Sequence, residues 1–339
     1  MPEIYLPEKI IFKKNVLNEF TPDNCNRALM LCDSESMQNS GVFEMISNKS
    51  KKMISHVSTV VNTNIHELYN SAADIFTENE AQLIIAAGSG AAIDCGMLLS
   101  HQSGAKFTAI PCGCASALTD FETAEYYTYR HSPNTLILDP ALIEKIPSGE
   151  IAYGGFATLG FAIDALGYSD NVIVRSLAMH GAIGILKNII PAYRGDIRAL
   201  EGLMYSMYFA VASHRNAKSV DKSLLSRVSA FFSQFGFSKA SVCAVILPEI
   251  FEAESTILNS ALAEIAVAMN IAHHTDSEQT ASLLLTEKIR RIAASLAIPR
   301  AISGFGLKPL DFQKANLQSD LPEDILETCY YGSFKFMKM

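Results

Sequence analysis

Two hydrophobic patterns alternate along the first 150 residues. Short apolar runs typical of buried strands cover residues 27–33, 53–61, 81–90 and 106–113. Between them, residues 64–80 and 91–103 have the spacing of amphipathic helices. This alternation predicts a parallel sheet covered by helices on both faces. Residues 125–140 place alternating β-forming residues around a polar turn, which predicts a β-hairpin.

The pattern changes near residue 150. Beyond it the strand signals nearly vanish, and apolar residues recur at the i, i+3, i+4 spacing of helices. The predicted helices are residues 171–190, 199–214, 224–235, 260–274 and 277–299. We therefore expect two domains: an α/β, Rossmann-like domain with a parallel sheet over residues 1–150, and an all-helical domain over residues 151–339.

Composition narrows the classes of partner. The chain has 339 residues, of which 49% are hydrophobic and 18% charged, so it can bury a large core. Its net charge of −8 and its scattered lysines and arginines argue against nucleic acid and anionic membranes as partners. The N-terminal segment lacks the apolar core of a secretory signal, and no long apolar run predicts a membrane span. The 7 cysteines, without a C-x-x-C pair, favour reduced thiols, so we expect a cytoplasmic protein. The expected partner is a small-molecule substrate.

A turn of small residues is the first candidate for chemistry. Gly88, Ser89 and Gly90 stand between a predicted strand and a predicted helix, where backbone N–H groups and a helix N-terminus can hold a phosphate. The spacing is not that of the Rossmann fingerprint, because Ile93 stands where its third glycine would be. It is not a Walker loop either, so a plain tight turn remains an alternative.

Three segments in order resemble the iron-containing alcohol dehydrogenase family, whose fold group includes dehydroquinate synthase and glycerol dehydrogenases. Residues 88–97 match in position the family's G-G-G-S-x-x-D-x-x-K turn. Residues 110–119 match its i-P-T-T-a-G-T-G-S-E segment, and residues 137–142 match its i-l-D-P-e-L segment. The resemblance implies a dehydroquinate synthase-like fold and an NAD(P)-dependent oxidoreductase acting on a small alcohol or aldehyde. Family members are commonly dimers or larger, so we expect a homo-oligomer, in the simplest case a dimer.

The resemblance also implies a nucleotide site on the first domain. The pyrophosphate would lie on the small-residue turn. Asp33 matches the acidic residue that binds the adenosine ribose, and a carboxylate there repels a 2′-phosphate, so NAD is expected rather than NADP. The residues expected to contact the nucleotide are Asp33, Gly88, Ser89, Gly90, Asp94, Cys112, Gly113 and Ser116.

The family's metal ligands are missing at the matching positions. In the family, an Asp, a His four residues later and two further His residues hold a divalent metal that lowers the pKa of the alcohol. Here Ala157 and Phe161 take the first two positions, and Lys239 takes the last. The remaining position falls within residues 222–225, which contain no His. We therefore expect no metal, and a substrate pocket at Ala157 and Phe161, between the two domains, that is more apolar than is usual in the family.

Two functions follow from these substitutions. In the first, the Lys239 ammonium replaces the charge of the metal and His214 acts as a proton donor, giving a metal-independent oxidoreductase. The alternative is a catalytically inactive nucleotide-binding homologue with a binding or regulatory role. Elsewhere, His273, His274 and Asp276 are the densest group of potential ligands, but adjacent residues of a helix point about 100° apart.

Overall fold

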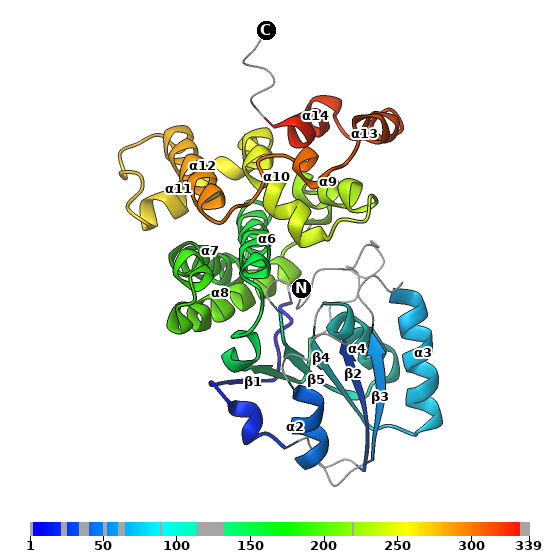
Figure 1. Ribbon diagram of the computed structural model, residues 1–339. Helices are drawn as coiled ribbons and strands as arrows, with labels where there is room; N and C mark the ends of the chain where they lie inside the picture. Colours follow the sequence, from blue (N-terminus) through cyan, green and yellow to red (C-terminus); the bar gives the residue numbers. More distant parts are fainter. Residues whose placement is uncertain are drawn as a thin grey trace. The chain divides into compact units, whose positions relative to one another are not determined.

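The computed structural model describes residues 3–21, 26–33, 41–49, 53–59, 65–88, 90–113, 132–218 and 220–332. The chain divides into two compact units, Met1–Pro147 and Ser148–Met339, close to the point where the sequence pattern changes. We call them unit 1 and unit 2. Unit 1 contains a parallel sheet, and the described part of unit 2 is helical (Figure 1). The predicted fold class is confirmed.

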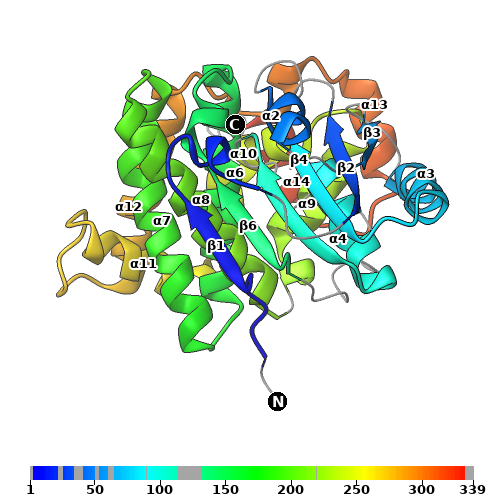
Figure 2. The ribbon, with the colours of Figure 1, turned by 90° about the horizontal axis from the view of Figure 1, so that it is seen from below.

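The sheet of unit 1 has six strands in the order β1-β6-β5-β4-β2-β3, and every pair is parallel (Figure 2). The strands are β1 (Lys9–Phe12), β2 (Arg27–Asp33), β3 (Met53–Thr59), β4 (Leu83–Gly88), β5 (Lys106–Pro111) and β6 (Thr135–Leu138). The helices of this unit are α2 (Val42–Lys49), α3 (Ile65–Glu78) and α4 (Gly90–Ser103), with the 3₁₀ turns η1 (Val16–Asn18) and η2 (Pro140–Ile143).

Both faces of the central strands are buried, because successive side chains of a strand point to opposite faces. On one face Met30, Ile85 and Ile137 belong to a cluster that also contains residues of η1 and α2. On the other face α4 packs against β4 and β5. At Gly96 of α4 a Cβ atom would lie 2.7 Å from the ring of Phe107, so only glycine allows this close approach.

The described part of residues 125–140 does not form the predicted hairpin. β6 pairs in parallel with β1 on one side and with β5 on the other, so both of its hydrogen-bonding edges are taken. Residues 125–131 lie outside the described part of the chain. The sequence prediction also missed β1, because this strand is short, lies among charged residues and pairs with a segment far along the chain.

The Asp139 carboxylate joins the N-terminal segment to the end of β6. Its Oδ1 accepts the backbone N–H groups of Asn15 at 2.7 Å and Ala141 at 3.1 Å, and its Oδ2 accepts that of Leu17 at 3.1 Å. Asn15 has a φ of +61°, so its backbone is held in the left-handed region. The Asp-Pro pair that carries the family resemblance therefore has a structural role in this chain.

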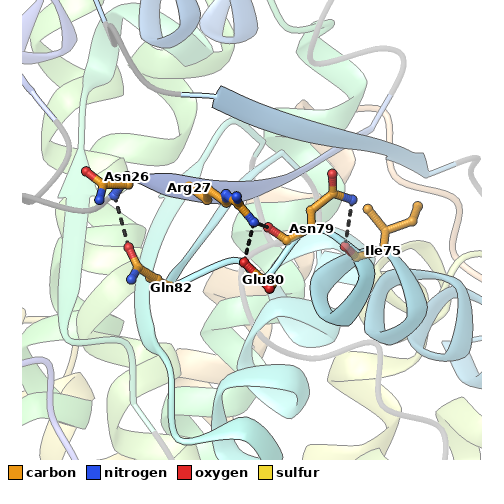
Figure 3. A network of polar contacts seen from close by, with 6 residues as sticks. All are labelled: Asn26, Arg27, Ile75, Asn79, Glu80 and Gln82. Atoms are coloured by element: carbon orange, nitrogen blue, oxygen red, sulfur yellow. Dashed lines mark hydrogen bonds and ion pairs between the residues drawn. The ribbon is translucent and has the colours of Figure 1, made fainter.

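A polar network links helix α3 to the amino ends of β2 and β4 (Figure 3). The Arg27 guanidinium donates to the carbonyl of Asn79 at 3.2 Å and forms an ion pair with Glu80 at 2.5 Å. The Asn26 backbone N–H donates to the Gln82 side chain at 3.0 Å. These groups are largely exposed, so the network contributes little to the stability of the fold.

Unit 2 is built around helix α6, which packs against α7, α8, α10 and α11 and is buried along most of its length. Its larger helices are α6 (Ser148–Gly167), α7 (Val172–Tyr193), α8 (Ile197–Asn216), α9 (Leu224–Ser233), α10 (Lys239–Ala253), α11 (Ser255–Ala268), α12 (Glu278–Ser295), α13 (Pro309–Asn316) and α14 (Glu323–Tyr331). The 3₁₀ turns η3 (Val220–Lys222) and η4 (Ile302–Phe305) complete the described elements. Side-chain caps at Asn171, Asp196 and Ser277 begin α7, α8 and α12. The predicted starts agree for α7 and α12, whereas α8 begins two residues before the predicted residue 199.

Helix α7 is long and apolar enough, by composition, to cross a membrane. In the structure it packs against α6 and α8 and buries Val174, Ala178 and Ile185. At Gly181 a Cβ atom would lie 2.7 Å from the backbone nitrogen of Ala210, so α7 and α8 are in close contact. A buried core helix meets the same criterion, so α7 alone does not overturn the expectation of no membrane span.

Replacing Asp139 by alanine should lower the free energy of unfolding by about 2 kcal/mol, because three backbone N–H groups lose a buried carboxylate acceptor. Urea unfolding of the full chain, followed by circular dichroism, measures this loss. The matched control is Asp196→Ala, which removes an exposed helix cap and should cost about 1 kcal/mol. A loss at Asp139 no larger than at Asp196 would contradict its role.

Candidate functional site

The turn between β4 and α4 is the first part of the candidate site. β4 ends at Gly88, whose φ of +140° is a conformation that other L residues rarely adopt, and α4 begins at Gly90. The Cys112 N–H donates to the Gly88 carbonyl at 3.1 Å, which ties the turn to the end of β5 just before Gly113. The first N–H groups of α4 lack partners within the helix and lie at the carboxyl edge of the sheet, where α/β proteins bind nucleotide phosphates.

Strand register brings Asp33 to the same edge. Cys32 of β2 pairs with Ala87 of β4, so the backbone of Asp33, the last residue of β2, lies beside Gly88. In a parallel sheet all strands end at this edge, which is why residues from separate strands meet there. The role of Asp33 in binding the ribose stays a prediction.

Asp94 is buried in α4, close to the same turn. Burial, and then the neighbouring Asp94 carboxylate, raise the pKa of the Cys95 thiol to about 12, so Cys95 stays a thiol at neutral pH. Ser89 and Ser116 lie outside the described residues, and their contribution to the nucleotide site stays a prediction.

Three residues predicted for the catalytic centre come together in unit 2. The ring of Phe161 on α6 packs against the imidazole of His214 on α8, with centroids 4.7 Å apart. Burial, followed by the positive charges of Lys239 at the start of α10 and of Arg215, lowers the pKa of His214 to about 3. His214 is therefore a neutral imidazole throughout the neutral pH range.

The neutral state of His214 changes its predicted role. Burial and the nearby charges disfavour the imidazolium form at neutral pH, so a proton donor here would have to act from the neutral ring. The role of His214 as proton donor stays a prediction. Neutral imidazole still donates one hydrogen bond and accepts another. The Nε2 atom of His214 is buried and has no hydrogen-bond partner within the described ranges. This buried polar atom without a partner belongs to a ring that packs against Phe161.

The start of α10 is electropositive. Ser238 caps the helix by accepting the N–H of Ser241 at 3.2 Å, and the partly exposed Lys239 takes the first helical position. The helix dipole opposes a cation at this end, so helix stability does not explain a lysine there. Its ammonium and the first N–H groups of α10 together favour a negative charge.

The residues at the predicted metal positions do not fit a divalent metal. Ala157 and Phe161 are buried hydrocarbon side chains, and Lys239 is a cation. Ser223 lies within residues 222–225, where the remaining metal ligand would fall. Its hydroxyl donates a hydrogen bond to the Asp164 carboxylate at 2.6 Å. Over the described ranges, no group of three His, Cys, Asp or Glu side chains could hold a metal ion. That Ala157 and Phe161 line a substrate pocket stays a prediction.

The sequence analysis missed a buried polar group close to this centre. Asp164 lies one turn beyond Phe161 on α6 and interacts with Glu254, which lies between α10 and α11. An acidic residue deep inside an otherwise apolar helix was the one available signal. Its partners come from separate helices, so the sequence does not point to them.

Comparison with known proteins agrees with this architecture. The model of the family described as iron-containing alcohol dehydrogenase matches residues 7–119. The crystal structure of a 1,3-propanediol oxidoreductase superimposes with a TM-score of 0.83 and 17% identity, covering 98% of this chain and 99% of that one. An alcohol dehydrogenase from Oenococcus oeni gives a TM-score of 0.80 and 18% identity, covering 97% and 100%.

The chain has the fold of the iron-containing alcohol dehydrogenases. The predicted resemblance to this family is confirmed. A maleylacetate reductase from Agrobacterium tumefaciens has the same fold, with a TM-score of 0.75, 18% identity and coverage of 98% and 99%. No curated protein matches the chain in sequence. Identities this low establish the fold, and they do not carry a substrate from one protein to another.

Nuclear magnetic resonance titration of the histidines should show no protonation of His214 between about pH 5 and pH 8, because its pKa lies near 3. Lys239→Met should raise that pKa by removing a nearby positive charge, whereas Lys222→Met, at an exposed position, should not. Titration of His214 with its ordinary midpoint of 6.5 would contradict the burial and charge described here.

The lowered pKa of His214 also makes the free energy of unfolding depend on pH. The folded chain binds the His214 proton more weakly than the unfolded chain does, so stability rises with pH wherever the two differ. The contribution of this residue is therefore complete above 6.5 and is lost as the pH falls from 6.5 towards 3.

Proposed function

We propose that the protein is an NAD(P)-dependent oxidoreductase that interconverts a small alcohol and its aldehyde without the divalent metal usual in its family. The observation that carries the proposal is the charge at the start of α10. Lys239 stands there, close enough to His214 to lower the pKa of its imidazole. The fold and the match of the family model to residues 7–119 support the reaction class.

Unit 1 would hold the nucleotide. The Gly88 turn and the N-terminus of α4 suit a pyrophosphate, because a helix N-terminus presents backbone N–H groups to an anion. Asp33 at the end of β2 favours NAD over NADP. When bound, the nicotinamide accepts or donates the hydride. The chain itself then has to position the nucleotide and to stabilise the charge that develops on the substrate oxygen.

Unit 2 would stabilise that charge. When an alcohol becomes an aldehyde, a hydride passes to NAD⁺, the hydroxyl proton passes to water, and negative charge develops on the oxygen. The Lys239 ammonium and the first N–H groups of α10 would lie against this oxygen. His214, being neutral, would supply one hydrogen bond from its open Nε2 without adding charge.

The substrate is defined only as a small molecule. Neighbours with the same fold include a 1,3-propanediol oxidoreductase and a maleylacetate reductase, so the fold accommodates chemically different substrates. The expected homo-oligomer and cytoplasmic location stay predictions.

Lys239→Met should lower kcat for NADH-dependent reduction of an aldehyde by about 10²–10³-fold, the usual cost of removing a donor that stabilises an oxyanion. NADH binding, measured by fluorescence titration, should stay unchanged, because Lys239 belongs to unit 2. The matched control is Lys288→Met, at an exposed position on α12. Full turnover in Lys239→Met would contradict the proposal. NADH binding without turnover of any aldehyde in a broad panel would instead favour the inactive nucleotide-binding homologue.

Gly88→Ala should weaken NADH binding at least about tenfold, because a side chain strains the turn and obstructs the approach of the pyrophosphate. The control is Gly104→Ala, which also replaces a glycine of positive φ but lies at the other end of α4 in open space. Equal affinities of the two variants for NADH would remove the turn from the nucleotide site.

A further inference from the structure

Two buried carboxyl groups in unit 2 take no part in the proposed reaction. Asp164 on α6 is 0% exposed, and Glu254, at the junction of α10 and α11, is 6% exposed. They are close enough for the charge of Glu254 to act on the carboxyl group of Asp164. Together with their partners they connect α6, α9, α10 and α11.

In each carboxyl group one oxygen accepts hydrogen bonds, and the other has no partner within the described ranges. Asp164 Oδ2 accepts the Ser223 hydroxyl at 2.6 Å. Glu254 Oε1 accepts the Tyr168 hydroxyl at 2.5 Å and the Leu224 backbone N–H at 2.9 Å. Asp164 Oδ1 and Glu254 Oε2 are buried, and neither has a hydrogen-bond partner in the part of the chain that the structure describes.

The surrounding cations are engaged elsewhere. Arg227 on α9 acts on Glu254 through its charge, but its guanidinium is paired with Asp320 at 3.3 Å. Two other arginines on the packed helices have partners of their own: Arg175 of α7 pairs with Glu264 of α11, and Arg290 of α12 pairs with Glu249 and Glu252 of α10. Within the described ranges, no ion pair includes Asp164 or Glu254.

Two ionised carboxylates in this position would be costly. Burial removes their hydration, and within the described ranges neither carboxylate has an ion-pair partner to replace it. Burial, and then the charge of Glu254, raise the pKa of Asp164 well above its ordinary value, against a smaller opposing effect of the Ser223 hydrogen bond. Burial also raises the pKa of Glu254, which is opposed by its bonds to Tyr168 and Leu224 and by Arg227. Asp164 therefore binds a proton more tightly than Glu254 does.

We propose that Asp164 and Glu254 hold a single proton at neutral pH, carried by Asp164, and that its loss at alkaline pH loosens the junction of α6, α9, α10 and α11. The pair is then a pH-sensitive device built into the helical unit. The proposal stands whether or not the protein turns over an alcohol.

The direction of the pH effect follows from linkage. The folded chain binds this proton more tightly than the unfolded chain does. The stabilisation is complete below the pKa of the unfolded carboxyl, and it is lost as the pH rises through the pKa of the folded state. Asp164→Asn removes the titrating group while its amide oxygen can still accept the Ser223 hydroxyl. The melting temperature of this variant relative to the natural chain should therefore rise with pH.

Infrared spectroscopy of the full chain tests the proposal directly. At neutral pH the natural chain should show the carbonyl stretch of a protonated carboxyl group, which disappears at alkaline pH. Asp164→Asn should lack the band, and the control Glu264→Gln, which removes a carboxylate paired with Arg175, should keep it. If Asp164→Asn does not fold, the band of the natural chain and its pH dependence still decide the question. Glu254→Gln should then move the loss of the band to a lower pH, because the charge that helps to raise the pKa of Asp164 is removed.

Three results would overturn the proposal. The first is the absence of the band at neutral pH. The second is a difference in melting temperature between Asp164→Asn and the natural chain that does not change with pH. The third is a melting temperature that rises on adding sodium, potassium or magnesium ions to the natural chain but not to Asp164→Asn, because a bound cation would then take the place of the proton.

Discussion

The burial of α6 is the constraint on which the chemistry of unit 2 depends. This helix carries the positions where the resemblance places the first two metal ligands, and here they are the hydrocarbon side chains of Ala157 and Phe161. A buried surface without a metal tolerates little unpaired charge. His214 is accordingly neutral, and Asp164 is driven towards its protonated form. The positive charge that remains near this centre, on Lys239, lies at the partly exposed start of α10.

A nucleotide turn in unit 1 and a metal site in unit 2 depend on different kinds of atoms. The turn at Gly88 works through backbone geometry, so neighbouring side chains can change while a phosphate is still accommodated. A metal site works through particular side-chain atoms, and one substitution to alanine or phenylalanine removes a ligand outright. This difference explains how a chain can have the fold of the iron-containing alcohol dehydrogenases while residues at the metal positions are replaced.

Local patterns predicted most of the fold. Buried strands such as Leu83–Gly88 and capped helices such as Val172–Tyr193 follow from periodicity and caps alone. Some of the errors concern pairing over long distances, because the short edge strand β1 and the two parallel neighbours of β6 leave no local signal. The helices α2, α6 and α10 were also not among the predicted helices. In the site, the resemblance singled out Phe161, His214 and Lys239. The neutral state of His214 and the Asp164–Glu254 pair depend on burial and on contacts between helices, which one sequence does not reveal.

The central claim is that a lysine supplies the positive charge that a metal supplies elsewhere in the family. The most direct test measures aldehyde reduction by NADH and bound metal in the same sample of natural protein, before and after exhaustive chelation. The account predicts turnover that is unchanged when bound iron and zinc fall far below one ion per chain. Turnover that falls in proportion to the metal removed, and returns when iron or zinc is added back, would contradict it.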